Sequence, residues 1–190
     1  MSPTQLRRVC HSLRRGGIIA YPTEAVWGLG CDPRNAGAVR RLLALKQRPM
    51  HKGLILVADN LQVLSPWLLP LPEKLRIRIQ QPSVHPITWV LAAHPRCPRY
   101  LRGKHDTLAV RLSIHPAAHN MRNLCRQWRG PLVSTSANFT GHVPARSLWD
   151  LRRSGVLKQV DDYLPGLTGG LSVPSEIRDP GSGKVIRSGL

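Results

Sequence analysis

The chain has 190 residues, with 28 lysine and arginine residues against 10 aspartate and glutamate residues, which gives a formal net charge of +18. Hydrophobic residues make up 42% of it, enough to bury a core and too many for a disordered basic tail. Its apolar runs fall well short of the ~20 residues of a membrane-spanning helix, and the first residues lack the apolar core of a signal peptide, so we expect a soluble, cytoplasmic protein that does not enter a membrane.

Helices and strands alternate irregularly in the hydrophobic pattern. Helices are predicted near residues 6–13, 39–47, 116–128 and 147–153, and in pieces over 60–82, where prolines interrupt the spacing. Strands are predicted at residues 18–21, 54–58, 87–91, 107–112, 132–136, 175–178 and 184–187, with a loop between the first strand and the second helix. No repeat or linker divides the chain, so residues 1–190 are expected to form one α/β domain with a mixed sheet.

The basic residues are mostly arginine, 22 against six lysines. A guanidinium group binds phosphate through two parallel hydrogen bonds and stays charged in every surrounding, so this surplus favours a polyanionic partner. The sequence pI of about 11.4 also favours nucleic acid. Because aromatic residues make up only 5% of the chain, such contacts would be directed at phosphates and not at stacked bases. A solvated basic surface without a specific partner is the alternative.

The pattern of cysteines and histidines does not predict a metal site. The four cysteines, Cys10, Cys31, Cys97 and Cys125, are scattered without a CxxC or CxxH spacing. We expect them to be buried as small hydrophobic residues or to be idle thiols. His115 and His119 are four residues apart, but Pro116 stands between them at an expected helix start.

Two glycine-rich stretches imitate nucleotide-binding motifs. Gly28 and Gly30 suggest a dinucleotide fingerprint, but Pro33 occupies the place of its third glycine. Residues 181–184 read GSGK, as in part of a phosphate-binding loop, but Val185 replaces the required serine or threonine. We predict that residues 181–184 form a turn between two strands.

Polar residues follow the first expected strand and the second expected helix. Thr23 and Glu24 come directly after the strand, and Gly28 and Gly30 would let the backbone approach a ligand closely. Lys46 and Arg48 stand at the end of a helix, where cations are common because they interact favourably with the helix dipole, whether or not a ligand binds.

Further polar clusters end later strands. Residues 134–138 read STSAN, which fits either a ligand site or a helix cap and turn. Residues 174–179 and Arg187 place more polar groups at the ends of the last strands.

In combination, five segments resemble the YrdC-like family, the threonylcarbamoyl-AMP synthases that begin threonylcarbamoyladenosine formation in tRNA. They are PTEAVWGLG at 22–30, KQRP at 46–49, TLAVR at 107–111, STSAN at 134–138 and PSEIRD at 174–179. The resemblance implies a YrdC-like α/β fold, a twisted open mixed sheet with flanking helices and a basic concave surface. It also implies the short bacterial form, since 190 residues leave no room for the additional C-terminal domain of long members.

The reaction implied by the resemblance is that of an ATP-dependent nucleotidyltransferase: L-threonine, bicarbonate and ATP give threonylcarbamoyl-AMP and pyrophosphate. Cations must then neutralise the triphosphate, because the attacking carbamate is itself an anion. Mg²⁺ is expected with ATP. We assign no residue as general acid or base. The expected partners are tRNA, through the basic surface, and the enzyme complex that transfers the threonylcarbamoyl group.

The resemblance also implies roles for individual residues. For ATP, the matching positions are Lys46, Arg48, Thr107, Ser134, Ser136, Asn138 and Arg187. For threonine, they are Thr23, Arg111 and Ser175, with Arg111 pairing with the carboxylate.

One segment departs from the family pattern. The family commonly has a WPGP-type turn ahead of the strand that begins near Thr88, whereas this chain reads SVHP at residues 83–86, and the effect of that change is left open. Two other functions also stay open at this point: a non-catalytic RNA-binding module, and a paralogue that acts on a different substrate.

Overall fold

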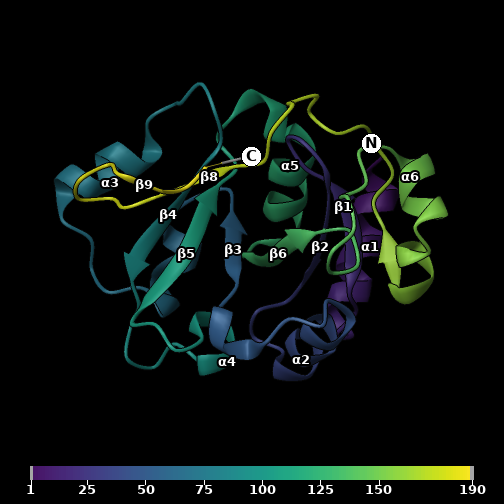
Figure 1. The fold of residues 1–190 in the computed structure, drawn as a ribbon, viewed down its shortest axis with the longest axis horizontal. Coiled ribbons are helices and arrows are strands. Elements are labelled where there is room, and N and C mark those ends of the chain that lie inside the picture. Colours follow the sequence, from purple (N-terminus) through teal and green to yellow (C-terminus); the bar gives the residue numbers. More distant parts are fainter. Residues whose placement is uncertain (1, 189–190) are drawn as a thin grey trace.

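The computed structural model describes residues 2–188, and its centre is one mixed sheet of nine strands (Figure 1). The neighbouring pairs β1–β7, β3–β5 and β4–β8 are parallel and the other pairs are antiparallel. The two edge strands do not pair with each other, so the sheet is open, as predicted. In spatial order the strands are β7 (Asp162–Tyr163), β1 (Ile19–Pro22), β2 (Trp27–Cys31), β6 (Leu132–Ser136), β3 (Ile55–Ala58), β5 (Thr107–Leu112), β4 (Ile87–Ala92), β8 (Glu176–Arg178) and β9 (Val185–Arg187).

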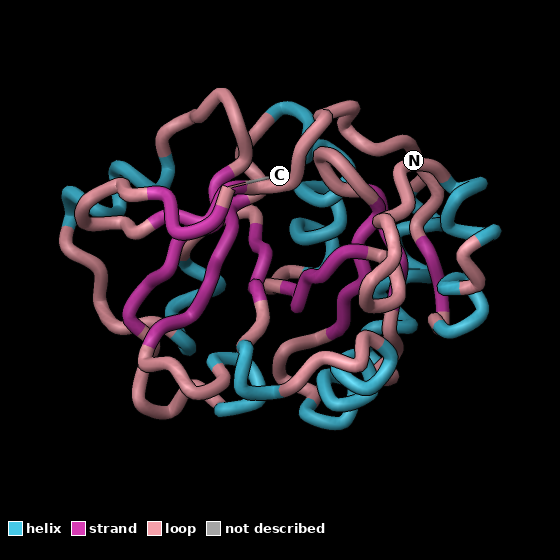
Figure 2. The backbone as a smooth tube through the Cα atoms, viewed as in Figure 1, coloured by secondary structure: helices cyan, strands magenta, loops and turns pink. Residues whose placement is uncertain are grey.

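Helices flank the sheet (Figure 2). Three of the α-helices begin at side chains that accept a backbone hydrogen bond, Ser2 for α1, Asn35 for α2 and Ser147 for α6. The α-helices are α1 (Pro3–Arg14), α2 (Ala36–Leu45), α3 (Glu73–Gln80), α4 (Arg99–Arg102), α5 (His119–Trp128) and α6 (Leu148–Arg153). Short 3-10 helices are η1 (Met50–Lys52), η2 (Gln62–Trp67), η3 (Pro116–Ala118) and η4 (Val156–Gln159).

Two hydrophobic clusters cover opposite faces of the sheet, because side chains alternate along each strand. On one face, α1 and α5 pack on β1, β3 and β6 through residues such as Leu13, Tyr21 and Leu124. On the other face, the larger cluster includes Trp27 and Leu42, with residues of α2, α3, α4 and α6. The first face is polar where it continues onto β4 and β5, since Thr88 and Arg111 project there.

After β7 the chain crosses from one end of the sheet to the other, where β8 and β9 lie (the yellow-green to yellow path in Figure 1). On the way, Gly169 and Leu171 donate backbone hydrogen bonds to the carbonyls of Thr23 and Glu24, at 2.8 and 3.0 Å. The crossing segment therefore fixes the loop between β1 and β2 against the rest of the fold.

Most predicted elements are confirmed, and β5 and β6 have the predicted bounds. The expected loop after the first strand is wrong in part, because β2 runs through Trp27–Cys31. Its two glycines remove the side chains that would have shown a strand alternation. The short elements β7 and α4 were also missed. The GSGK stretch is confirmed as a turn between β8 and β9, closed by hydrogen bonds between Asp179 and the backbone of residues 183 and 184.

All four cysteines are buried, as predicted, and burial raises the pKa of each thiol. Within residues 2–188, no three His, Cys, Asp or Glu side chains are grouped closely enough to hold a metal ion. No helix in that range has the length and apolar character to cross a bilayer.

Gly30 makes room for Tyr21, whose ring contacts both glycines of β2. A Cβ atom on Gly30 would lie 2.4 Å from the carbonyl oxygen of Val133 and 2.9 Å from the Tyr21 ring. The Tyr21 hydroxyl, in turn, donates a 2.9 Å hydrogen bond to Ser134. Gly30 therefore provides the space in which Tyr21 packs, and its predicted role in the approach of a ligand stays a prediction.

We expect Gly30→Ala to lower the free energy of unfolding by about 1–3 kcal/mol, because the added methyl group overlaps backbone that cannot move freely. Gly181→Ala is the matched control, since its nearest atom beyond the chain neighbours is Asp179 Oδ1 at 3.5 Å, and it should change stability by less than about 0.5 kcal/mol. Urea unfolding measures both. Equal effects of the two substitutions would contradict this account of Gly30.

Candidate active site

Strand register places polar side chains next to one another on the open part of the sheet face that α1 and α5 cover elsewhere. Directly paired residues of neighbouring strands project on the same face. Ser134 of β6 is paired with Gly30 and Ile55, and Arg111 of β5 is paired with Val57 and Thr88.

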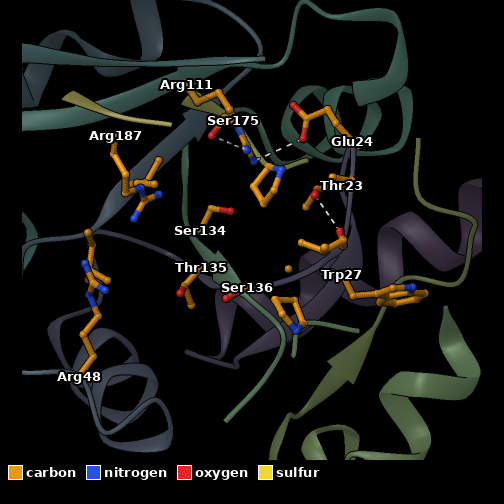
Figure 3. Close-up of a pocket in the computed structure, with 17 residues that line it drawn as sticks. Thr23, Glu24, Trp27, Arg48, Arg111, Ser134, Thr135, Ser136, Ser175 and Arg187 are labelled. Carbon is orange, nitrogen blue, oxygen red and sulfur yellow. Dashed lines mark hydrogen bonds and ion pairs between the residues drawn. The ribbon is translucent and has the colours of Figure 1, made fainter. Parts of the chain in front are cut away.

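This face holds a cavity of about 220 Å³ that is open to solvent (Figure 3). Seven of the ten predicted site residues line it: Thr23, Arg48, Arg111, Ser134, Ser136, Ser175 and Arg187. Other lining residues include Glu24, Trp27, Gly28, Thr135 and Pro174. In the view of Figure 3, Arg48 and Arg187 lie on one side, Thr23 and Glu24 lie on the other, and residues 134–136 lie between them.

The tight loop between β1 and β2 places Thr23 and Glu24 at the cavity. The backbone amide and the hydroxyl of Thr23 both donate to the carbonyl oxygen of Val26, at 3.0 and 2.7 Å. Both Thr23 and Glu24 are buried. The loop is therefore fixed by the hydrogen bonds from Thr23 to Val26 within it, and by the hydrogen bonds that it accepts from the crossing segment.

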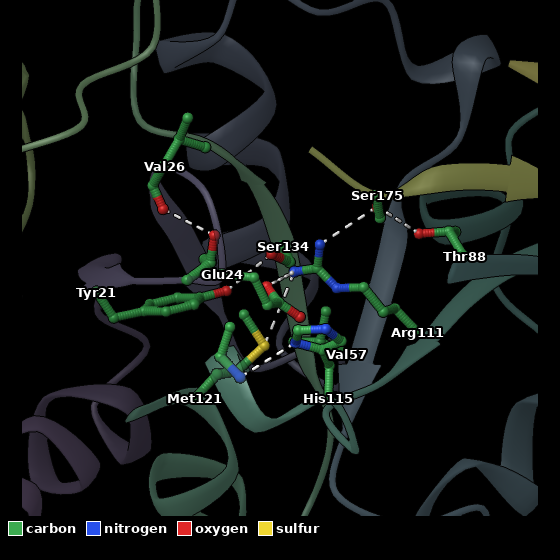
Figure 4. Close-up of polar contacts among 12 residues, drawn as sticks. Tyr21, Glu24, Val26, Val57, Thr88, Arg111, His115, Met121, Ser134 and Ser175 are labelled. Carbon is green, nitrogen blue, oxygen red and sulfur yellow. Dashed lines mark hydrogen bonds and ion pairs between the residues drawn. The ribbon is translucent and has the colours of Figure 1, made fainter. Parts of the chain in front are cut away.

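Arg111 lies at the same end of the cavity as Glu24 (Figure 4). Its Nη1 donates to Ser175 Oγ at 3.3 Å, and Ser175 Oγ is 2.9 Å from Thr88 Oγ1. Its Nη2 lies 3.5 Å from a carboxylate oxygen of Glu24. The guanidinium is nearly fully buried, so these contacts fix its position before any ligand arrives.

Arg48 and Arg187 bring two positive charges to the other side of the cavity. The Nε and Nη2 atoms of Arg48 donate to the carbonyl oxygen of Gly53, at 3.1 and 2.9 Å. Burial and the neighbouring charge of Arg187 lower the pKa of Arg48. Within residues 2–188, neither arginine has a carboxylate at ion-pair distance, so this side has an unneutralised positive charge that favours an anion.

Lys46 does not line the cavity, although it precedes Arg48 by only two residues. Gln47 between them has a left-handed φ of 45°, and this turn directs the two side chains apart. Lys46 is only 6% exposed. Its Nζ donates to the carbonyl oxygen of Ser136 at 2.8 Å, to Asn138 Oδ1 at 2.7 Å and to the carbonyl oxygen of Asn138. Contact of Lys46 with phosphate stays a prediction, and it would require the ammonium to leave these three acceptors.

Asn138 and Thr107 also lie outside the cavity lining. Asn138 supports the loop after β6, because its Oδ1 accepts hydrogen bonds from Lys46 and from Ser136 Oγ, the latter at 2.6 Å. Thr107 shares a sheet face with Arg111 but stands at the opposite end of β5, paired with Ala92. Their direct contacts with a nucleotide stay predictions.

The sequence pattern does not predict the supporting contacts of Tyr21, Thr88 and Glu24. Tyr21 and Thr88 hold Ser134 and Ser175 through hydrogen bonds. The place of Glu24 directly after a strand does not by itself indicate its partner. The contact of Glu24 with Arg111 cannot be predicted from local sequence, because it forms only when β1 and β5 lie in one sheet.

The charge of Lys46 gives the fold a distinctive pH dependence. Burial and, to a smaller extent, Arg48 lower the pKa of Lys46 from 10.5 to about 8. Between these two values the unfolded chain holds a proton that the folded chain lacks, so this group makes unfolding less favourable as the pH rises. Relative to Lys46→Met, the free energy of unfolding of the wild type should rise by at most about 1.4 kcal/mol per pH unit from about pH 8 to 10.5.

Urea unfolding at several pH values measures this difference. Exposed Lys158 is the control, and Lys158→Met should follow the wild-type curve in parallel. If the free energy of unfolding of Lys46→Met also changes with pH in parallel with the wild type, the three oxygen acceptors outweigh burial and the amine keeps its proton.

Comparison with known proteins decides the family. The sequence model of the Sua5/YciO/YrdC family, described as "Telomere recombination", matches residues 11–189. The chain belongs to the Sua5/YciO/YrdC family. It is 50% identical over 185 residues to the threonylcarbamoyl-AMP synthase of Halorhodospira halophila, covering 97% of this chain and 95% of the relative. It is 48% identical over 180 residues to the enzyme of the same name from Xanthomonas campestris, covering 93% of each.

A solved member of the family is also similar in three dimensions. The crystal structure of P. abyssi Sua5 complexed with L-threonine matches with a TM-score of 0.84 and 26% sequence identity, over 94% of this chain and 52% of that one. The chain thus spans about half the length of this Sua5 structure. The YrdC-like fold predicted from the sequence is confirmed.

Proposed function

We propose that this chain is a threonylcarbamoyl-AMP synthase, which converts L-threonine, bicarbonate and ATP into threonylcarbamoyl-AMP and pyrophosphate. The observation that carries the proposal is the 50% identity, over nearly the full length of both chains, to a relative with that name. The cavity supports it, because its two sides differ in charge as two different substrates require.

Arg111 and Ser175 would take the carboxylate of threonine. The guanidinium of Arg111 is already fixed by Ser175 and Glu24, so binding loses little conformational freedom. Thr23 stands at the same cavity with a small hydroxyl side chain. A site that bonds a hydroxyl group discriminates strongly against an isostere that lacks it, which favours threonine over valine.

Arg48 and Arg187 would hold the phosphates of ATP, with Ser134 and Ser136 bonding the nucleotide. Their charges would neutralise the triphosphate as the carbamate oxygen attacks the α-phosphorus and pyrophosphate leaves. This reaction makes the enzyme a nucleotidyltransferase. Mg²⁺ would enter with ATP, held by phosphate oxygens and water, because Glu24 is the only carboxylate among the described lining residues and it faces Arg111.

Pyrophosphate release tests the proposal. It should require threonine, bicarbonate and ATP together, and valine should not replace threonine. Arg48→Ala and Arg187→Ala should each lower release about 10- to 100-fold, since each removes a charge-assisted hydrogen bond. The double variant should lose less than the product of the two.

Arg96→Ala is the control for lost charge, because Arg96 is exposed and outside the cavity. Circular dichroism confirms folding of each variant. Release without threonine would contradict the proposed reaction, and normal release by folded Arg48 and Arg187 variants would remove these residues from the ATP site.

We also propose that tRNA and the enzyme complex that transfers the threonylcarbamoyl group are partners. The net charge of +18 supports contact with an RNA backbone. The product is a mixed anhydride, which water hydrolyses, and this supports its direct transfer to the next enzyme.

Binding of tRNA should weaken steeply between low and moderate salt, because phosphate contacts release counterions. Arg48→Ala should keep most of the affinity, since one cavity charge is a small part of the surplus. Filter binding at several salt concentrations measures this. An affinity that does not change with salt would contradict a phosphate-directed surface.

A further inference from the structure

Glu24 is buried in the cavity without a hydrogen-bond donor. It is only 2% exposed, and neither of its carboxylate oxygens accepts a hydrogen bond from the described residues. Its nearest cation, Arg111 Nη2, is 3.5 Å away. Charge-assisted hydrogen bonds between such groups are about 2.7–2.9 Å long, so the pair is in ion contact without a closed hydrogen bond.

A buried carboxylate in this state is unusual, because buried polar groups are almost always hydrogen-bonded. Arg111 also keeps an unpaired donor at Nε. Figure 3 shows the Glu24 carboxylate turned toward the Arg111 guanidinium, with Thr23 and Ser175 beside them. At one end of the cavity, a buried cation and a buried anion therefore lie side by side, each with unused hydrogen-bonding capacity.

That arrangement is complementary to an amino-acid zwitterion, in which two bonds separate the nitrogen from the carboxylate carbon. We propose that Glu24 binds the α-ammonium group of threonine and accepts one of its protons. The inference rests on the proposed function and names the group that prepares the amine for reaction.

The ammonium gives one proton to Glu24, which becomes a neutral carboxylic acid, and the nitrogen gains a free electron pair. That pair forms the C–N bond to bicarbonate, whose C–O bond to the hydroxyl group breaks. The leaving hydroxide takes a second proton from the nitrogen and departs as water. The products are the threonine carbamate anion, water and protonated Glu24, which returns its proton to solvent.

A binding comparison isolates the contact with the ammonium. Threonine and 3-hydroxybutanoate differ only in the α-amino group, and calorimetry without ATP or bicarbonate gives the affinity for each. The wild type should prefer threonine by about 10- to 100-fold, as one charge-assisted hydrogen bond predicts. Glu24→Gln should lose that preference, while its affinity for 3-hydroxybutanoate stays within a few-fold of the wild-type value.

Two further variants serve as controls for this binding experiment. Glu176→Gln is the matched control, because Glu176 pairs with Arg178 away from the cavity, and it should keep the wild-type preference. Arg111→Lys should weaken both ligands alike, because both carry the carboxylate. If Glu24→Gln also weakens both ligands alike, Glu24 only positions Arg111 and the inference is wrong. If the wild type binds neither ligand, the proposed function fails first.

Proton acceptance has its own test. In Glu24→Gln, pyrophosphate release at saturating threonine should fall by about 100-fold or more, as loss of a general base predicts. The reverse half-reaction, in which threonylcarbamoyl-AMP and pyrophosphate give ATP and the carbamate, moves no ammonium proton and should stay within about tenfold. Equal losses in both directions would overturn the role in proton transfer.

Removal of the buried charge can also unfold the chain, because Arg111 would lose its counter-charge. Thermal unfolding of Glu24→Gln checks this. If the variant does not fold, Glu24→Asp replaces it. The shorter carboxylate should keep part of the preference for threonine, and an unchanged preference together with unchanged release would contradict the inference.

Discussion

The period of two along each strand is the constraint on which both the core and the cavity depend. In β5, Leu108, Val110 and Leu112 project into the larger hydrophobic cluster, and Arg111 therefore projects to the other face. A slip of one residue would bury the guanidinium among apolar side chains and expose Val110. The burial of the three apolar side chains thus fixes the position of the group that would bind the substrate carboxylate.

The same constraint explains why the cavity lies where it does. Helices α1 and α5 cover the part of the sheet face where Ile19, Tyr21 and Leu132 need burial. Further along that face the strands carry hydroxyl and guanidinium groups, which need no apolar cover. Position within the sheet, more than any single motif, decides which polar residues meet.

Much of the fold could be predicted from the sequence because β5 and β6 are continuous runs of strand-forming residues between clear breaks. β2 could not, because Gly28 and Gly30 hide its alternation. Seven predicted site residues line the cavity, since each lies on a strand face or a loop that the register brings there. The burial of Lys46 could not be predicted, because it depends on the left-handed turn at Gln47 and on acceptors from residues 136–138. The pairing of Glu24 with Arg111 depends on sheet order, which local pattern does not contain.

The crossing segment and the β8–β9 hairpin also determine when the cavity can form during synthesis. Ser175, directly before β8, and Arg187, on β9, are the last lining residues to be synthesised. Of these two strands, β8 pairs with β4, which is made much earlier, and β9 pairs with β8. A nascent chain that has emerged only as far as α6 can pack α1 and α5 on the sheet but still lacks one wall of the cavity. Substrate affinity is therefore acquired late on the ribosome, after most of the hydrophobic core has already been translated.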